Sequence, residues 1–440
     1  MLSKSTQTMV LSTMGKRYFS MSTPKSKHFK LVVVGGGAGG CSIAAKFARK
    51  IDPKSIAVIE PADMHYYQPQ WTMVGGGMKK LEESGRTMES VLPKSITWLK
   101  EKAVGFYPDK NLIQISGKNQ EPIQYDYLVV ATGIQLNFNQ IKGLIQAFDT
   151  PGVCSNYSPL YVNKTLESIK GFKKGNAIFT FPNTPIKCAG APQKIMYIAD
   201  SYFRKHGKRQ DANVVFNTSL GVLFGVKKYA DALWEIVKKR DIKVNLRTNL
   251  VEVIPKERKA IFENLDKPGT SETFDYEMLH VTPPMGPHDV MKTSAGDLVD
   301  PAGYVNLNKT TLQHVKYQNI FGLGDCTNLP TSKTAAAVAG QCGILSQNLW
   351  SVMNGKDPLG QYDGYTSCPL VTSYSTCVLA EFDYTSQPLE TFPVNQAKES
   401  RVAFHLKKDI MPGIYWNLML NGHWNGPAAF RKIAHLGFGK

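Results

Sequence analysis

The hydrophobic pattern near the start of the chain predicts a buried strand, a tight turn and a helix in immediate succession. Residues 31–34 form a continuous apolar run, which is typical of a strand covered on both faces of a parallel sheet. Glycines then follow at the spacing G-x-G-x-x-G, and apolar residues recur at helical intervals from Ile43 to Ala48. A second apolar strand, 55–59, ends at an acidic residue. This order is typical of the α/β unit that binds a dinucleotide.

Each glycine of this unit has a physical role in binding phosphate. Gly35 permits the tight turn, Gly37 lets the backbone approach a pyrophosphate, and Gly40 lets the helix pack closely on the strand. The start of the helix presents free N–H groups and a partial positive charge. Glu60 follows at the distance where a carboxylate can bind a ribose hydroxyl. The predicted cofactor contacts in this unit are Gly35, Gly37, Ala38, Gly39, Gly40 and Glu60.

Two later strands carry further cofactor motifs. The apolar strand 125–130 leads into an Ala-Thr-Gly turn, and the strand 319–322 leads into a GxGD sequence that ends at Asp325. Both resemble motifs of flavoproteins with two dinucleotide-binding domains. There, the acid binds the ribityl chain, and the next helix points its N-terminus at the flavin edge where reduction places negative charge. The resemblance implies FAD, with the contacts Ala131, Thr132, Gly133, Asp325, Lys333, Thr334, Ala335, Ala336, Ala337 and Val338.

The middle of the chain repeats the strand pattern without the glycine turn. Apolar strands are predicted at 176–181 and 213–216. Where an enzyme that uses NADH or NADPH has a second GxGxxG, residues 182–192 read PNTPIKCAGAP, and their prolines remove backbone N–H donors. We therefore expect no nicotinamide nucleotide to bind here, and we interpret the segment as a loop that presents Cys188.

These patterns predict an α/β protein with two Rossmann-like dinucleotide-binding domains and an amphipathic, membrane-associating C-terminal region. The length of 440 residues suffices for two or more cores. The predicted division is a tail at 1–27, a first part of the FAD-binding domain at 28–150, a second Rossmann-like domain at 151–295, a second part of the FAD-binding domain at 296–355, and the C-terminal region at 356–440.

The positive charge of the chain is concentrated at its two ends. The net charge is +17, and residues 1–51 contain no Asp or Glu. The first 27 residues are rich in Ser, Thr, Met and basic residues, which is typical of a mitochondrial transit peptide, and we expect cleavage after Phe19. Residues 401–440 mix six Lys or Arg and one acid with large apolar side chains, as in a helix that lies in a membrane surface. A dimerisation or domain-covering helix is the alternative for this tail.

Other classes of partner are disfavoured by the sequence. It has no run of 18 apolar residues that would predict a membrane-spanning helix. Basic residues do not interleave with stacking aromatic residues in a nucleic-acid module, so we expect no nucleic-acid partner. The seven cysteines stand at irregular spacings, which fit neither a secreted disulfide framework nor a metal site.

Two of these cysteines, Cys188 and Cys368, are flanked by proline, glycine and small polar residues, a setting that suits a thiol presented near a cofactor. Cys41 stands alone on the first predicted helix and lacks the CxxxxC partner of glutathione-reductase-type enzymes. A thiolate is the reactive form in thiol–disulfide exchange, and nearby positive charge favours it. Lys187 and Lys194 are the candidates for that charge.

From about Phe29 onward the chain resembles the sulfide:quinone oxidoreductases of animal mitochondria. The most specific blocks are FPNTPIKCAGAPQK, FNTSLGVLFGVKKYADAL, FGLGDCTNLPTSKTAAAV and YDGYTSCPLVT. The resemblance implies that hydrogen sulfide attacks a Cys188–Cys368 disulfide, which an extra sulfur can bridge, and leaves a persulfide on Cys368. It implies that electrons pass to FAD and then to ubiquinone, and that the sulfur passes to glutathione, sulfite or another small acceptor.

The same resemblance implies Gln68 and Val104 as further FAD contacts. The resemblance also implies that the protein is located on the matrix side of the mitochondrial inner membrane, where it binds the membrane surface without spanning it. It is compatible with an oligomer. The spare cysteines are Cys154, Cys326, Cys342 and Cys377, and the last is the alternative for the second reactive thiol because it is close to Cys368 in sequence.

Two other functions compete with sulfide oxidation. A type II NADH:quinone oxidoreductase needs a second glycine turn after the 176–181 strand, where this chain has proline and cysteine. A non-catalytic flavin-binding redox scaffold is the other alternative, and it would keep its role when Cys188 and Cys368 are replaced.

Overall fold

The computed structural model describes residues 27–117, 121–294 and 296–437. The predicted transit peptide lies outside the described residues except for Lys27. The strands are β1 (Lys27–Val34), β2 (Ile56–Ile59), β3 (Met64–Tyr66), β4 (Gly85–Thr87), β5 (Thr97–Leu99), β6 (Ala103–Tyr107), β7 (Leu112–Ile115), β8 (Ile123–Val130), β9 (Gln135–Leu136), β10 (Val153–Cys154), β11 (Gly175–Phe181), β12 (Ala212–Thr218), β13 (Lys243–Asn245), β14 (Thr248–Ile254), β15 (Lys259–Asn264), β16 (Ser271–Asp275), β17 (Met278–His280), β18 (Met285–Gly286), β19 (Ile320–Gly322), β20 (Thr366–Val371) and β21 (Cys377–Phe382).

The α-helices vary from four to nineteen residues. They are α1 (Ala38–Phe47), α2 (Trp71–Gly75), α3 (Met88–Val91), α4 (Leu144–Ala147), α5 (Val162–Gly171), α6 (Ala191–Lys205), α7 (Lys227–Lys239), α8 (Asp289–Lys292), α9 (Ala335–Met353), α10 (Arg401–His405), α11 (Met411–Ile414) and α12 (Ala428–Ala434).

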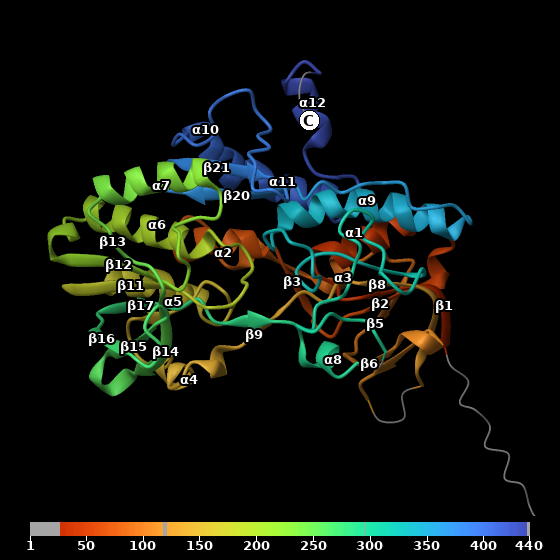
Figure 1. Cartoon of the computed structure of the whole chain (residues 1–440), viewed down its shortest axis with the longest axis horizontal. Coiled ribbons are helices and arrows are strands. Elements are labelled where there is room, and N and C mark those ends of the chain that lie inside the picture. Colours follow the sequence, from red (N-terminus) through yellow and green to blue (C-terminus); the bar gives the residue numbers. More distant parts are fainter. Residues whose placement is uncertain (1–26, 118–120, 295, 438–440) are drawn as a thin grey trace, which may run out of the picture.

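A seven-stranded sheet forms one half of the molecule, on the right in Figure 1. Strands β5, β2, β1, β8 and β19 are parallel neighbours, while β7 and β6 continue the sheet in antiparallel fashion. The apolar run 31–34 is the buried end of β1, and it lies in register with 56–59 of β2 and 127–130 of β8. Helices α1 and α9 pack against each other above this sheet. The strands predicted at 31–34, 55–59, 125–130 and 319–322 therefore form one sheet.

A five-stranded, all-parallel sheet forms the other half, with the order β10-β17-β11-β12-β13. The two strands predicted at 176–181 and 213–216 are its neighbouring strands β11 and β12. Helices α6 and α7 lie above this sheet in Figure 1, and the antiparallel strands β14, β15 and β16 lie below it. The short pair β9 and β18 joins the two halves. The two sheets confirm the predicted α/β fold.

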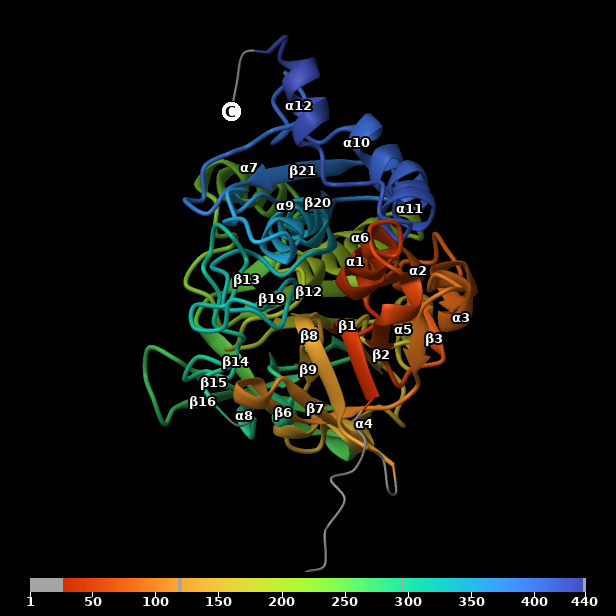
Figure 2. The ribbon, with the colours of Figure 1, turned by 90° about the vertical axis from the view of Figure 1, so that its right-hand side faces the viewer.

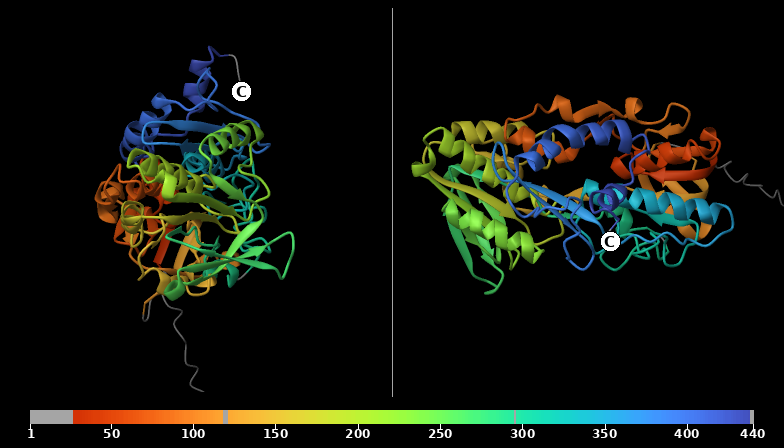
Figure 3. Two further views of the ribbon diagram at one scale, coloured as in Figure 1. Left: turned by 90° about the vertical axis from the view of Figure 1, so that its left-hand side faces the viewer. Right: turned by 90° about the horizontal axis from the view of Figure 1, so that it is seen from above.

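The C-terminal part covers both halves, as the layer at the top of Figures 1 and 2. Its hairpin, β20 and β21, packs on α6, while a helical run from Arg401 to Met419 includes two π-helical turns at Leu406–Ile410 and Tyr415–Met419. The view from above shows this run lying across the junction of the two halves (Figure 3). None of the helices in the described part of the chain has the length and apolar run that a membrane span requires.

Candidate active site

The sulfurs of Cys188 and Cys368 lie 3.6 Å apart, although the two residues are 180 positions apart in the chain. Cys188 belongs to the loop between β11 and α6, and Cys368 belongs to β20 of the C-terminal hairpin. The separation is that of a hydrogen bond between sulfurs, and it is longer than the disulfide bond length of about 2.05 Å. The fold thus brings together the two cysteines that the sequence singled out.

The backbone of Cys188 is held in a conformation that few non-glycine residues adopt. Its φ is 57°, in the left-handed region, which costs about 1–3 kcal/mol and persists only where the surroundings enforce it. Two hydrogen bonds do so here. The Cys188 N–H donates to the carbonyl of Lys333 at 2.7 Å, and its carbonyl accepts from the N–H of Ala191 at 2.8 Å. The Cys188 sulfur is therefore fixed between the start of α6 and the start of α9.

Lys194 supplies a positive charge to this sulfur pair. It lies on the first turns of α6, is 3% exposed, and its Nζ donates to the Cys188 sulfur at 3.2 Å. A hydrogen bond from the Cys368 thiol, together with the Lys194 ammonium, holds the pKa of Cys188 well below its usual range despite burial. The same hydrogen bond, reinforced by burial, raises the pKa of Cys368 well above its usual range. In the reduced pair, Cys188 is therefore the thiolate and Cys368 the thiol that donates to it.

Lys187, the other lysine proposed to activate the thiol, does not contact Cys188. Its Nζ donates to Oε1 of Gln68 at 2.8 Å. The prediction for Lys187 is corrected accordingly: its ammonium is bound by the amide oxygen of Gln68.

Lys407 is a site residue that sequence reasoning missed. It is 4% exposed, its Nζ donates to the carbonyl of Pro69 at 3.0 Å, and it lies 5.5 Å from the centre of the Tyr67 ring. Burial and repulsion from Lys194 lower the pKa of Lys407 to about 8. The sequence shows Lys407 only as one of several basic residues in the tail. The residues next to Lys407 in the sequence do not indicate that it lies in a π-helical turn that buries it beside Tyr67 and Pro69.

The remaining cysteines do not face the pair. Cys377 starts β21 and pairs with Val371, whereas Cys368 pairs with Ala380, so the two thiols occupy different ends of the hairpin. The geometry thus favours Cys368 over Cys377. Burial raises the pKa of every other thiol, as expected for cysteines that only fill a core: Cys41, Cys154, Cys326, Cys342 and Cys377.

The glycine turn after β1 has one open face. Gly35 has φ of 102°, and an added Cβ at Gly40 would lie 1.8 Å from the Gly35 carbonyl oxygen, so both positions require glycine for the turn itself. Gly37 differs, because an added Cβ there would meet no protein atom within 4 Å. Helix α1 begins directly afterwards with Ala38, Gly39 and Gly40. The turn fits a cofactor phosphate, which could approach the backbone at Gly37 and the N-terminus of α1.

Glu60 and the Ala-Thr-Gly turn flank this cradle. The Glu60 carboxylate accepts from the N–H of Gly36 at 2.7 Å and of Ala62 at 2.8 Å, and each oxygen keeps a second lone pair for a ribose hydroxyl. At the end of β8, Ala131 lies against Gly35, where an added Cβ would meet the Ala131 carbonyl oxygen at 2.3 Å. Thr132 and Gly133 continue that turn, and Gly133 also has open space on its Cα.

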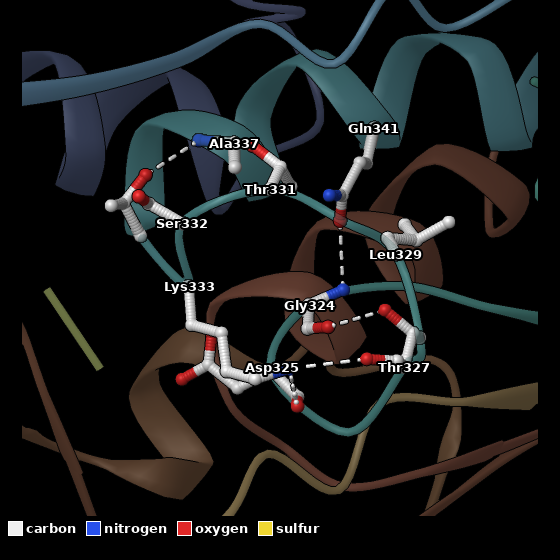
Figure 4. A pocket seen from close by; sticks show the side chains of 10 residues that line it. Gly324, Asp325, Thr327, Leu329, Thr331, Ser332, Lys333, Ala337 and Gln341 are labelled. Atoms are coloured by element: carbon white, nitrogen blue, oxygen red, sulfur yellow. Dashed lines mark hydrogen bonds between the residues drawn. The ribbon is translucent and has the colours of Figure 1, made fainter. Parts of the chain in front are cut away.

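A small pocket joins the GxGD loop to the start of α9 (Figure 4). The Thr334 hydroxyl caps α9 by accepting from the N–H of Ala337 at 3.0 Å, so the N–H groups of Ala335 and Ala336 remain available at the helix start. Burial raises the pKa of Asp325. The lining residues are Gly324, Asp325, Thr327, Leu329, Thr331, Ser332, Lys333, Thr334, Ala337 and Gln341. Val338 completes the first turn of α9.

Three predicted contacts have other surroundings than expected. Lys333 donates to the carbonyl oxygens of Asp325 at 2.7 Å and Thr327 at 3.1 Å, and lies 4.3 Å from the centre of the Tyr304 ring, so its ammonium stabilises its own loop. Gln68 holds Lys187. Val104, on β6, is 51% exposed. Their contacts with a cofactor remain predictions.

Taken together, the open glycine turn, the carboxylate after β2 and the N-terminus of α9 fit a dinucleotide cofactor. Cys188 is tied to that arrangement, because its N–H is bonded to the residue before Thr334. Within the described residues, no group of three or more His, Cys, Asp or Glu side chains is placed to hold a metal ion.

Comparison with known proteins identifies similar sequences and similar folds. A family model for pyridine nucleotide-disulphide oxidoreductases matches residues 29–176. The mitochondrial sulfide:quinone oxidoreductase of Mus musculus is 54% identical over 411 residues, which cover 93% of this chain and 90% of the mouse protein. The mitochondrial sulfide:quinone oxidoreductase of Dictyostelium discoideum is 47% identical, over 90% of this chain and 87% of the Dictyostelium protein. The X-ray structure of sulfide:quinone oxidoreductase from Aquifex aeolicus has the same fold, with a TM-score of 0.78, 20% identity and coverage of 94% and 96%.

Proposed function

Because this chain belongs to the mitochondrial sulfide:quinone oxidoreductases, we propose that the Cys188–Cys368 pair performs the sulfur chemistry of sulfide oxidation. The enzyme oxidises sulfide and reduces a quinone, and its family implies a flavin cofactor. The observation that carries the proposal is the 3.6 Å contact between the two sulfurs, one of them bonded to a buried lysine.

The first step is an exchange at the disulfide form of the pair. Hydrosulfide attacks the sulfur of Cys368, a new S–S bond forms there, and the Cys188–Cys368 bond breaks. Cys368 then carries a persulfide, and Cys188 leaves as a thiolate. Lys194 favours this direction of attack, because its ammonium, bonded to the Cys188 sulfur at 3.2 Å, stabilises the leaving thiolate.

The persulfide sulfur is next taken by a nucleophile, for which we propose glutathione, sulfite or a similar small acceptor. Attack on the outer sulfur forms an S–S bond in the product and releases Cys368 as a thiolate. The two buried ammonium groups of Lys194 and Lys407 stabilise the negative charge that accumulates at the pair.

Re-forming the Cys188–Cys368 bond releases two electrons, and bound FAD supplies the acceptor that relays them to ubiquinone. We propose that FAD is held by the turn at Gly35, Gly37 and Gly40, by Glu60, and by the pocket between Asp325 and Thr334. The hydrogen bond from the Cys188 N–H to the Lys333 carbonyl supports this proposal, since it places Cys188 next to the start of α9, which would hold the flavin.

The C-terminal layer is the proposed contact with the membrane and with ubiquinone. Several large apolar side chains are exposed there among basic ones, as in helices that lie in a membrane surface. We place the enzyme on the matrix side of the mitochondrial inner membrane. The exposed apolar residues of this layer include Val402, Ile410, Leu418, Phe430, Ile433 and Leu436.

The test is an anaerobic stopped-flow experiment with the flavin-loaded protein. Sulfide together with sulfite as the sulfur acceptor should bleach the visible absorbance of the flavin, and a ubiquinone analogue should restore it. NADH should not bleach it at physiological concentration, since the loop after β11 carries prolines in place of a glycine turn. Flavin that stays oxidised in sulfide and sulfite would refute the proposal, and rapid bleaching by NADH would favour the NADH:quinone oxidoreductase alternative.

A further inference from the structure

Gly190 lies beside the contact between the sulfurs of Cys188 and Cys368. It follows Cys188 by two residues and directly precedes α6. An added Cβ at Gly190 would lie 2.4 Å from the Cys368 sulfur and 2.5 Å from Cδ2 of Leu370. Both distances are far shorter than the 3.5–4.0 Å at which non-bonded heavy atoms pack.

Glycine is required at position 190 because a larger residue has no space there, and not because of the backbone conformation. Gly190 has φ of −86° and ψ of −10°, a right-handed helical conformation that any residue adopts without strain. It therefore differs from Gly35, where the positive φ itself selects glycine. At Gly190 the missing side chain leaves the room that the Cys368 sulfur occupies.

The backbones of both Cys188 and Cys368 are held in place by hydrogen bonds. Cys188 is fixed through the carbonyl of Lys333 and the N–H of Ala191. Cys368 is fixed in the β20–β21 ladder, where it pairs with Ala380, and it is 2% exposed. Leu370 is fully buried against the same helix. A methyl group at Gly190 must therefore turn the Cys368 side chain away or push β20 away from α6, and either change moves the Cys368 sulfur from its place beside Cys188.

We propose that Gly190 is a positioning residue of the sulfur chemistry, whose lack of a side chain lets Cys368 reach Cys188. This inference rests on the proposed role of the pair. Closing the S–S bond requires the sulfurs to approach from 3.6 Å to about 2.05 Å, and any outward displacement of β20 widens the gap that must close. Displacements of about 1 Å at reacting atoms cost about 100-fold in rate.

The test compares Gly190→Ala with Gly171→Ala in the flavin-loaded, full-length protein. Gly171 ends α5, and an added Cβ there would meet no atom within 4 Å, so it is a matched control. Each protein is reduced, reoxidised with diamide, alkylated and digested, and the cross-linked Cys188–Cys368 peptide is measured by mass spectrometry. In Gly190→Ala the cross-linked fraction should fall about tenfold or more and sulfide-driven flavin bleaching should slow about 100-fold, with flavin content unchanged. Gly171→Ala should match the parent in all three.

A second variant separates the sulfur contact from ordinary packing. Gly190→Ala combined with Leu370→Val removes the overlap with Cδ2 of Leu370 and leaves the overlap with the Cys368 sulfur. The cross-link should still be lost if the sulfur contact is what matters. Recovery of the cross-link in the double variant, or a parental cross-link yield in Gly190→Ala, would overturn the proposal. Failure of sulfide to bleach the flavin in the parent protein, with its cross-link intact, would instead count against the proposed function.

Discussion

Two strand–turn–helix units of this molecule have the same architecture and different turns. In the first, β1 leads through the turn at residues 35–37 into α1, and in the second, β11 leads through residues 182–190 into α6. The short turn leaves Gly37 with an open face toward the helix N-terminus, whereas the long turn places Cys188 and Lys194 at the same end of α6. One fold element can therefore present backbone N–H groups to a phosphate or a thiolate to another sulfur, and the length and composition of the turn decide which.

The comparison also separates two uses of glycine. Gly37 and Gly190 each precede a helix, and both have negative φ. Space above Gly37 is free of protein atoms, but space above Gly190 contains the sulfur of Cys368. The first glycine is suited to admit a ligand, and the second admits a part of the protein itself.

The largest expected effect comes from removing the thiolate of the second unit. Cys188→Ser should slow sulfide-driven bleaching of the flavin by about 10⁴-fold, because a serine hydroxyl cannot form the disulfide with Cys368 that hydrosulfide attacks. Stopped-flow absorbance measures this, and the flavin content of the variant should equal that of the parent. Bleaching within a few-fold of the parental rate would show that Cys188 has no part in the chemistry.

A change in the first unit should affect cofactor binding and leave the sulfur pair intact. Gly37→Ala adds a methyl group that meets no protein atom, so the fold should be unchanged while the approach of a phosphate is blocked. FAD affinity, measured by fluorescence titration of the apoprotein, should fall about 100-fold, or about 2.7 kcal/mol. The Cys188–Cys368 cross-link should persist. Unchanged affinity would contradict the assignment of the phosphate to this turn.

The charge beside the thiolate should have a smaller effect. Lys194→Met removes the ammonium bonded to the Cys188 sulfur, so the pKa of Cys188 should rise and its thiolate fraction at neutral pH should fall. The midpoint of the pH profile for alkylation of Cys188 by iodoacetamide should move upward by about one pH unit. Lys187→Met is the control, since Lys187 is bonded to Gln68. Equal shifts in the two variants would contradict the geometry.

The smallest effect concerns Lys407, whose pKa is lowered to about 8 by burial and by Lys194. As the pH rises through this value the ammonium loses its proton, and the stabilisation of negative charge at the pair weakens. At saturating sulfide, the rate of flavin bleaching should therefore decline about threefold above pH 8. Lys407→Met should be slower at neutral pH and should lack this decline. A decline that survives in Lys407→Met would belong to another group.

More of the first strand–turn–helix unit than of the second could be predicted from the sequence. The strand at 31–34, the glycine spacing and Glu60 are local patterns, because hydrophobic period and turn chemistry act between near neighbours. Cys188 and Cys368 could be selected from seven cysteines through their surroundings and the family resemblance. Their contact, however, depends on how a C-terminal hairpin packs on α6, which no pattern near either cysteine encodes.

The same reason explains the residues that the sequence did not reveal. Lys407 is buried because it lies in the π-helical turn at Leu406–Ile410. The importance of Gly190 becomes visible only in the structure, where the Cys368 sulfur occupies the position that a side chain at residue 190 would need. Lys187 and Lys194 looked equivalent as neighbours of Cys188 in the sequence. Only their contacts in the folded chain distinguish them, since Nζ of Lys194 donates to the Cys188 sulfur and Nζ of Lys187 donates to Gln68.

The most direct test is to locate the sulfur after the first step, starting from the disulfide form of the pair and before any acceptor removes the sulfur. The flavin-loaded protein is mixed anaerobically with one equivalent of sulfide, alkylated without an added sulfur acceptor, digested and analysed by mass spectrometry. The account predicts the added mass of one sulfur atom on the peptide that contains Cys368, with Cys188 recovered without it. Extra sulfur on Cys188, or on neither cysteine, would contradict this prediction.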